Sequence, residues 1–305
     1  MSAPRTRRQM LGELTAMVTA LAVPASVSRA LGRPVFGDDD RERLAAWTKT
    51  LRTERLSRSD APLGRAAVRV GEQAAGTPYV ASTLEAYLKA GGKPTSTEPL
   101  TLSLTRFDCV TLVESCLAVA RVARASGAPT WERFGREVER MRYRGGTRGD
   151  YTSRNHYFSE WISDGERRGL VRDLGAELGG IEDARPLRFM TEHRASYPAL
   201  ADDGVYRAIG EMERRLDARP RHVVPTAHIA DVADRIQTGD VLAFATSIPG
   251  LDVSHSAMAY RDRAGVLRVL HAPLSGGVVE VTKTTLPEYV ARIRRGTGIL
   301  LARPA

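Results

Sequence analysis

The sequence predicts an α+β protein whose N-terminal half is helical and whose C-terminal half forms a mostly antiparallel sheet. In the first half, apolar residues recur at helical spacing, most strongly over 108–124. From Thr238 onward, short runs rich in β-branched or apolar residues alternate with Gly, Pro and Asp, which is typical of strands joined by turns. A chain of 305 residues, of which 42% are hydrophobic, is also long enough to bury a large core.

The N-terminus resembles a twin-arginine export signal. Residues 6–11, "TRRQML", precede an apolar run with small residues for cleavage after Ala25 or Ala30. The alternative is an exposed amphipathic helix. Pro24 interrupts the run, which falls short of the ~20 apolar residues of a membrane span. We therefore expect a periplasmic or extracytoplasmic protein with no stable membrane span after signal removal.

The expected organisation has three parts. They are the signal over 1–30, a helical or linker segment over 31–65, and a single domain over 66–305 with helical insertions at about 125–230. The formal net charge of +9 falls to about +6 when the signal is removed. The remaining basic residues are spread out without interleaved aromatic residues, so we expect no nucleic-acid partner. They suit a solvated face that approaches an anionic envelope polymer.

The helices and strands can be predicted in chain order. A charged helix is expected over 38–58, and Gly76-Thr77-Pro78 breaks the helical pattern that follows it. Further helices are expected over 108–124, over 131–143, from Thr152 or Ser153 through "HYFSEWI", over 205–216 and in "TLPEYVARIRR". Strands are expected in "GDVLAFAT", "VSHSAMAY", "GVLRVLHA", "GVVEVT" and "TGILLARP".

The helix over 108–124 carries both cysteines of the chain. Its apolar or small residues cover most of its circumference, so we expect it to be buried nearly all round, with Asp108 as its N-cap. Cys109 and Cys116 lie seven residues apart, roughly 10 Å along a helix. A disulfide needs Cα atoms within about 7 Å, so we expect two free thiols. Cys116 lies two turns inside the helix and is expected to be core.

Two histidines are expected on one face of the sheet. If "SHSAMAY" and "GVLRVLHA" form a hairpin with the three-residue loop 262–264, Arg261 pairs with Gly265 and His255 lies directly opposite His271. This register depends on the loop length, because a shift of one residue would turn one histidine to the other face.

This combination predicts a cysteine nucleophile. Cys109, at the first turn of a helix, gains from the helix dipole, and an adjacent imidazolium would lower its pKa further. His255 would be the general base and His271 would orient it, while the N–H of Cys109 would bind the oxyanion. The alternatives are a buried small cysteine and strand histidines that are satisfied polar groups.

Several segments together resemble the NlpC-type superfamily of papain-like cell-wall cysteine amidases and peptidases. They are "GTPYV" (76–80), "FDCVTLVES" (107–115), "TGDVLAF" (238–244), "VSHSAMAY" (253–260) and "LHA" (270–272). "LTRFDCVTLVES", "SRNHYFSEWI", "LGG" (178–180), "RFMTEH" and "GLDVSHSAMAY" resemble its N-acetylmuramoyl-L-alanine amidase-like branch. The resemblance runs from about Gly76 to Pro304. Thr111 is a departure, because the wider superfamily often has serine and glycine after "DCV".

The resemblance implies a papain-like fold with Cys109, His255 and His271 as catalytic residues. It also implies cleavage of the amide between N-acetylmuramic acid and L-alanine in peptidoglycan fragments, either muropeptides or anhydro-muropeptides. The substrate-binding residues that we expect are Tyr79, Asp108, Arg154, Asn155, His156, Tyr157 and Ser254. In the segment from Ser153 to Tyr157, Arg154 would meet a carboxylate or lactyl oxygen and Asn155 an acetamido group. The alternative for this segment is a capped amphipathic helix.

The sequence gives less support to metal-, nucleotide- and cofactor-dependent functions. There is no His-Glu-x-x-His or Cys-x-x-Cys pattern and no P-loop, so we expect no metal, no nucleotide and no cofactor. The remaining alternatives are an endopeptidase that cuts within the stem peptide, and a catalytically silent module that only binds muropeptides. The sequence does not indicate an oligomeric state.

Overall fold

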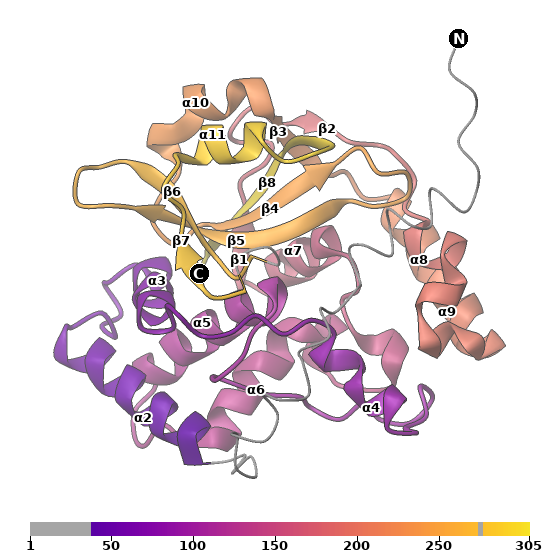
Figure 1. Cartoon of the computed structure of the whole chain (residues 1–305), viewed down its shortest axis with the longest axis horizontal. Helices are drawn as coiled ribbons and strands as arrows, with labels where there is room; N and C mark the ends of the chain where they lie inside the picture. The colour runs from indigo at the N-terminus through magenta and orange to yellow at the C-terminus, as the bar shows by residue number, and fades with distance from the viewer. Residues whose placement is uncertain (1–37, 274–276) are drawn as a thin grey trace, which may run out of the picture. The chain divides into compact units, whose positions relative to one another are not determined.

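The computed structural model describes residues 38–273 and 277–305, so the predicted export signal lies outside the described residues. Residues 39–305 form one compact unit. The predicted antiparallel sheet is confirmed, and helices pack on both of its faces (Figure 1). Within the described ranges, no helix is long and apolar enough to cross a membrane.

The described strands form an eight-stranded sheet in which every pair is antiparallel. The order is β2-β3-β8-β4-β5-β6-β7, and β1 also pairs with β8. The strands are β1 (Val171–Asp173), β2 (Ile181–Glu182), β3 (His222–Pro225), β4 (Val241–Thr246), β5 (Val253–Arg261), β6 (Leu267–His271), β7 (Glu280–Val281) and β8 (Gly296–Pro304).

Helices precede most of the sheet in the chain. The α-helices are α2 (Asp38–Thr53), α3 (Leu63–Gln73), α4 (Ala86–Lys89), α5 (Cys109–Arg124), α6 (Trp131–Arg142), α7 (Phe158–Arg167), α8 (Phe189–Glu192), α9 (Asp203–Asp217), α10 (Ile229–Val232) and α11 (Leu286–Ala291). The helices predicted at 108–124, 131–143 and 205–216 are therefore confirmed as α5, α6 and α9.

The central strand β4 is buried on both faces. Its alternate residues Val241, Ala243 and Ala245 join the core formed with α2, α3 and α5, whereas Leu242 and Phe244 pack with α10 and α11. Figure 1 shows α3 and α5 on one side of the sheet and α10 and α11 on the other. Burial on both faces explains why "VLAFA" is a continuous apolar run in the sequence.

The helix α5 occupies the middle of the larger core, as predicted. It packs against α3, α6 and β5, and most of its residues are buried. The guanidinium of Arg142 on α6 meets Glu114 of α5 at 2.8 Å, with both side chains almost fully buried. Arg142 also donates to the carbonyl of Thr101, at 2.6 Å. Because a buried charge is costly without a partner, this pair fixes the position of α6 on α5.

The start of α7 differs from the prediction. Asp150 caps a single 3-10 turn over Tyr151–Ser153, and the backbone at Arg154 is extended, with φ −70° and ψ 147°. The helix begins only at Phe158, so Thr152 and Ser153 are not its cap. The short strands β1 to β3 lie in a region whose sequence pattern predicts no clear element.

The hairpin of β5 and β6 also corrects the prediction. Arg261 pairs with Leu267 and Met258 with Leu270, so His255 and His271 are not directly opposite each other. The three loop residues are Arg263 to Gly265, because Asp262 donates its N–H to the carbonyl of Val266 at 3.0 Å. Gly265 has φ +82° and takes the left-handed last position of the loop, not the strand position predicted for it. The register moves by two residues, which keeps both histidines on one face.

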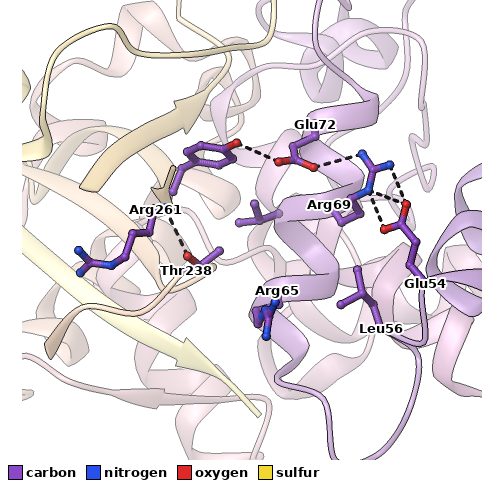
Figure 2. Close-up of a pocket in the computed structure, with 9 residues that line it drawn as sticks. Glu54, Leu56, Arg65, Arg69, Glu72, Thr238 and Arg261 are labelled. Carbon is purple, nitrogen blue, oxygen red and sulfur yellow. Dashed lines mark hydrogen bonds and ion pairs between the residues drawn. The ribbon is translucent and has the colours of Figure 1, made fainter. Parts of the chain in front are cut away.

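A network of charges joins α2 and α3 to β5 (Figure 2). Arg69 of α3 lies 2.8 Å from Glu54 and 3.1 Å from Glu72. The phenol of Tyr260 on β5 donates to Glu72 at 3.0 Å. These groups line a pocket of about 400 Å³ that contains none of the predicted site residues. Because the charges are about one-third exposed, the network orients the elements more than it stabilises them.

Candidate active site

A pocket of about 170 Å³ brings the predicted nucleophile and base together. Cys109 comes from the start of α5 and His255 from β5. Asn155 and His156 come from the extended segment before α7, and Phe158 and Trp161 from α7 itself. The full lining is Cys109, Val110, Asn155, His156, Phe158, Trp161, Leu251, Asp252, Val253, Ser254, His255 and Ser256.

Cys109 is the first residue of α5, and its position is fixed by a capping box. The Asp108 carboxylate accepts the N–H of Thr111 at 2.7 Å, while the Thr111 hydroxyl accepts the N–H of Asp108 at 2.9 Å. The predicted cap is therefore confirmed. Because the first N–H groups of a helix have no acceptor within it, those of Cys109 and Val110 can bind an oxygen in the pocket.

The environment of the sulfur favours the neutral thiol. Burial, and to a smaller extent the negative charge of Asp108, raise the pKa of Cys109 to about 11. The N–H and hydroxyl of Ser256 and the N–H of Val110 act in the opposite direction. The lowered thiol pKa that the sequence led us to expect is wrong for this state, because loss of water and the neighbouring carboxylate outweigh the helix dipole.

The two histidines are in direct contact. Nε2 of His255 lies 2.9 Å from Nδ1 of His271, with the rings nearly perpendicular at 72°. Phe244 stacks on His255 at 5.7 Å between ring centroids. The phenol oxygen of Tyr289, on α11, lies 3.3 Å from the same Nδ1 of His271. Since Nε2 of His255 faces His271, Nδ1 is the ring nitrogen left to exchange a proton with a reacting group.

Both imidazoles are neutral near pH 7. Burial lowers the pKa of His255 to about 3, and the adjacent His271 contributes in the same direction. Burial alone lowers the pKa of His271 to about 4. The resting site therefore combines a protonated thiol with an uncharged imidazole.

One wall of the pocket, formed by Asn155 and His156, presents hydrogen-bond acceptors. Nε2 of His156 donates to the Tyr151 carbonyl at 2.8 Å, so its Nδ1 is unprotonated. Burial and the charge of Arg154 lower the pKa of His156 well below 6.5, which keeps it neutral. The amide nitrogen of Asn155 donates to the Met141 carbonyl at 3.1 Å, and its Oδ1 has no partner among the described residues. This wall therefore suits a neutral N–H or O–H donor better than an anion.

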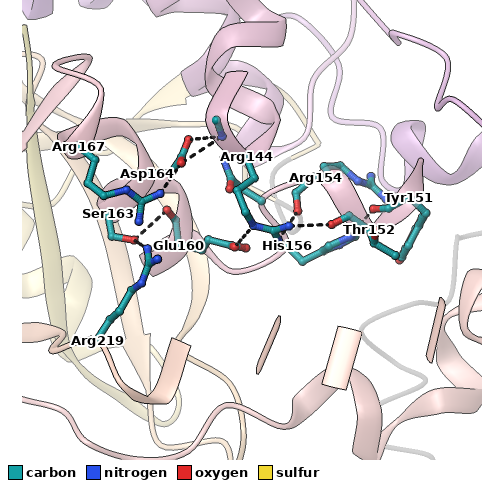
Figure 3. Close-up of polar contacts among 12 residues, drawn as sticks. Arg144, Tyr151, Thr152, Arg154, His156, Glu160, Ser163, Asp164, Arg167 and Arg219 are labelled. Atoms are coloured by element: carbon teal, nitrogen blue, oxygen red, sulfur yellow. Dashed lines mark hydrogen bonds and ion pairs between the residues drawn. The ribbon is translucent and has the colours of Figure 1, made fainter. Parts of the chain in front are cut away.

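Arg144 holds this wall in place (Figure 3). Its Nε donates to Glu160 of α7 at 2.6 Å, and its Nη1 donates to the Thr152 carbonyl at 3.1 Å. Nearby, Asp164 of α7 accepts the N–H of Gly145 at 3.2 Å. These contacts connect the segment before α7 to the helix itself, so Asn155 and His156 are held on a rigid support.

Comparisons with known proteins assign the chain to a family. The family model described as AmiA-like, N-acetylmuramoyl-L-alanine amidase-like, matches residues 69–299. The chain belongs to this family. Its fold is similar to an N-acetylmuramoyl-L-alanine amidase from Bacteroides uniformis, with TM-score 0.71 and 30% identity over 79% of this chain and 98% of that chain. No curated protein matches the chain significantly.

Two further solved structures share the fold. A Bacteroides fragilis protein, provisionally named a xylanase, is 33% identical, with TM-score 0.68 over 76% of this chain and 98% of that chain. A Legionella pneumophila protein is 19% identical, with TM-score 0.62 over 87% of this chain and 94% of that chain. At that identity the second likeness concerns the fold alone. Family membership makes this amidase-like chain a peptidoglycan-related hydrolase.

Among the predicted substrate-binding residues, Arg154 and Tyr157 do not line the pocket and instead pair with carboxylates away from it. Arg154 is buried and pairs with Glu85 at 2.6 Å and with Glu98 at 3.5 Å, because a buried guanidinium needs carboxylate partners. The phenol of Tyr157 donates to buried Glu213 at 2.7 Å and faces the α9 side of the amidase-like domain. Both predictions were wrong about contact with the pocket, although Arg154 still acts on it through the pKa of His156.

The other predicted residues lie at or near the site. Ser254 is exposed and lines the pocket with Asn155 and His156. Tyr79 is not part of the lining, but its phenol lies near Cys109 and Asp108, and burial together with these two groups raises its pKa to about 12. Asp108 also lies outside the lining and serves as the cap of α5.

Four residues of this amidase-like site are not predicted by the sequence. Ser256 faces the thiol, and Asp252 joins β5 to α7 by accepting the N–H of Ser159 at 2.8 Å. Trp161 lines the pocket and Tyr289 contacts His271. The sequence pattern predicts only that Trp161 belongs to a helix. Tyr289 reaches His271 because α11 packs on the sheet, and no local sequence pattern encodes this packing. In the described ranges, no three His, Cys, Asp or Glu side chains are arranged so that they could hold a metal ion.

Proposed function

We propose that this chain is a cysteine-dependent N-acetylmuramoyl-L-alanine amidase of the papain-like NlpC type. Its substrates would be peptidoglycan fragments, either muropeptides or anhydro-muropeptides. The observation that carries the proposal is the 2.9 Å contact between His255 and His271 at the pocket where Cys109 begins α5. A thiol, a base and a group that orients the base are the parts that amide cleavage by cysteine requires.

In the first half of the reaction, Nδ1 of His255 takes the proton of the Cys109 thiol while the sulfur attacks the carbonyl carbon of the lactyl amide. The carbonyl oxygen gains a negative charge, which the N–H groups of Cys109 and Val110 bind. Because both groups start uncharged, proton transfer accompanies attack. His255 then gives its proton to the amine nitrogen of L-alanine, the C–N bond breaks, and a thioester remains.

In the second half, His255 removes a proton from water, and the hydroxide oxygen attacks the thioester carbonyl. The C–S bond breaks and the sulfur regains its proton from His255. The products are a muramic acid with a free lactyl carboxylate and a peptide that begins with L-alanine. Asn155 and His156 would accept hydrogen bonds from N–H or O–H groups on the sugar side of the bond.

The pocket does not suit glycoside hydrolysis. Two facing carboxyl groups perform that reaction in most families. Asp252 supplies the only carboxylate of the described lining, and its oxygens accept the N–H groups of Ser159 and Val253. We therefore expect no turnover of xylan.

Export through the twin-arginine-type signal to the periplasm or another extracytoplasmic space is part of the same proposal.

Incubation of the purified protein with muropeptides and anhydro-muropeptides, followed by mass spectrometry, tests the proposal. The expected products are stem peptides with N-terminal L-alanine, and Cys109→Ala lowers the rate by more than about a thousandfold. Cys116→Ala is the matched control, because Cys116 is a core residue of the same helix and should leave the cleavage intact.

Other products would contradict the proposal in distinct ways. Cleavage after D-glutamate would make the chain an endopeptidase of the stem peptide. Binding of muropeptides without turnover would make it a silent binding module. Cleavage by Cys109→Ala would exclude the cysteine mechanism.

A further inference from the structure

His271 makes two contacts through one nitrogen and leaves the other without a partner. Its Nδ1 faces Nε2 of His255 and the phenol of Tyr289. Its Nε2 is buried and has no hydrogen-bond partner among the described residues. Burying a polar atom without a partner is costly, so the missing partner of Nε2 needs an explanation.

The proposed chemistry requires a particular tautomer of His271. For His255 to accept a proton at Nδ1, its Nε2 must carry hydrogen and donate it to Nδ1 of His271. His271 must then carry its own hydrogen at Nε2. Tyr289 favours the same form, because its phenol, which burial keeps protonated with a pKa of about 12, can donate to the unprotonated Nδ1.

Glu280 is placed to hold that hydrogen. It lies directly opposite His271 in the β6–β7 pair. Its Oε1 is 3.8 Å from Nε2 of His271, and its side chain is 48% exposed, which leaves it free to turn. A small rotation of the side chain would bring the oxygen within hydrogen-bond distance. An ionised carboxylate only accepts hydrogen bonds, so it can pair only with the tautomer that has hydrogen on Nε2.

We propose that Glu280 is a positioning residue that holds His271 in the Nε2–H tautomer and thereby makes Nδ1 of His255 the basic nitrogen. The ordered chain is Glu280, His271, His255 and Cys109. The inference rests on the proposed roles of Cys109 and His255, but the state of the His271 ring can be measured without any substrate.

Nitrogen-15 NMR of the histidine rings tests this directly in the full chain. The chain has six histidines, and His271→Gln identifies the signals of residue 271. At pH 7 we expect hydrogen on Nε2 of His271 in the wild type and a loss of this preference in Glu280→Leu. Glu280→Gln should restore it, because the amide oxygen still accepts a hydrogen bond.

Glu182→Leu is the matched control. Glu182 also lies on a short strand directly opposite a histidine, His222, in the β2–β3 pair, and neither residue belongs to the pocket. It should leave the His271 signals unchanged. With muropeptide as substrate, Glu280→Leu should lower kcat about tenfold with little change in KM, and Glu280→Gln should recover most of the loss.

The outcomes separate the two proposals. Hydrogen on Nδ1 of His271 in the wild type, or an unchanged ring in Glu280→Leu, would overturn the role of Glu280 even if the protein cleaves muropeptides. The expected ring signals in a protein that cleaves nothing would support Glu280 and contradict the proposed function alone.

Discussion

At the scale of single residues, the central feature is a thiol and an imidazole that both rest without charge. The thiol of Cys109 has its pKa raised to about 11, while that of His255 is lowered to about 3. Both shifts come mainly from loss of water, which penalises the charged form of either group. A preformed thiolate–imidazolium pair is therefore unfavourable, and in the proposed mechanism the sulfur becomes charged only as it reacts.

The protonation of Cys109 can be measured by alkylation with iodoacetamide. The thiolate is the reactive form, so the alkylation rate of Cys109 should rise about tenfold per pH unit between pH 7 and 10. Cys109→Ser measures the background from Cys116, which is almost fully buried and whose pKa burial also raises. An alkylation rate of Cys109 that does not change with pH below pH 8 would indicate a thiolate–imidazolium ion pair. It would contradict the neutral thiol and imidazole.

Asp108→Asn tests whether the Asp108 carboxylate contributes to the raised pKa of Cys109. Asparagine still accepts the N–H of Thr111 and caps α5, but it carries no charge. Because the Asp108 carboxylate raises the pKa of Cys109, its removal should increase the alkylation rate at pH 8. A slower rate would mean that the carboxylate does not oppose the thiolate.

At the scale of elements, the hairpin of β5 and β6 shows what the sequence could predict. The predicted hairpin register placed His255 and His271 on one face of the sheet, and this was correct. Their direct opposition was wrong, because the register depends on which loop residue adopts a positive φ. Because a shift of two residues keeps each side chain on the same face of the sheet, the two rings still lie next to each other although the loop prediction was wrong.

Other parts of the site show the limits of local patterns. The strong apolar periodicity of α5 correctly predicted that Cys109 lies in its first turn. A helix that is buried on several sides has apolar residues at regular spacing, which the sequence shows directly. Arg154 and Tyr157 were misplaced because their partners, Glu85 and Glu213, lie 69 and 56 residues away in the chain. Pairing of buried charges over such separations depends on tertiary packing, which single-sequence patterns do not encode.

The left-handed residue of the hairpin loop can be tested by substitution. A Cβ at Gly265 would meet no atom within 4 Å, so the cost of Gly265→Ala is conformational alone. We expect a loss of about 1 kcal/mol in the free energy of unfolding, measured with urea. Gly265→Asn should lose less, since asparagine adopts this conformation more readily. Equal stability of all three proteins would contradict the loop assignment.

At the scale of the whole molecule, three imidazoles with lowered pKa values make stability depend on pH. The pKa values of His255 and His271 are lowered to about 3 and about 4, and that of His156 falls well below 6.5. In the unfolded chain each imidazole binds a proton near pH 6.5. Between pH 6.5 and about 4 the unfolded state therefore binds more protons than the native state, so stability falls as the pH falls.

The contribution of one buried ring can be isolated by comparison of variants. Buried carboxyl groups with raised pKa values, such as those of Glu114 and Asp252, oppose the histidines over part of this range, but they are common to all the proteins compared. His271→Gln should have a shallower decline in unfolding free energy between pH 6.5 and 4, by at most one proton, or about 1.4 kcal/mol per pH unit. His228→Gln, at an exposed position, should keep the slope of the wild type. If His271→Gln and the wild type decline in parallel, His271 takes up its proton in the folded protein as readily as in the unfolded chain, and the neutral histidine pair at the site is wrong.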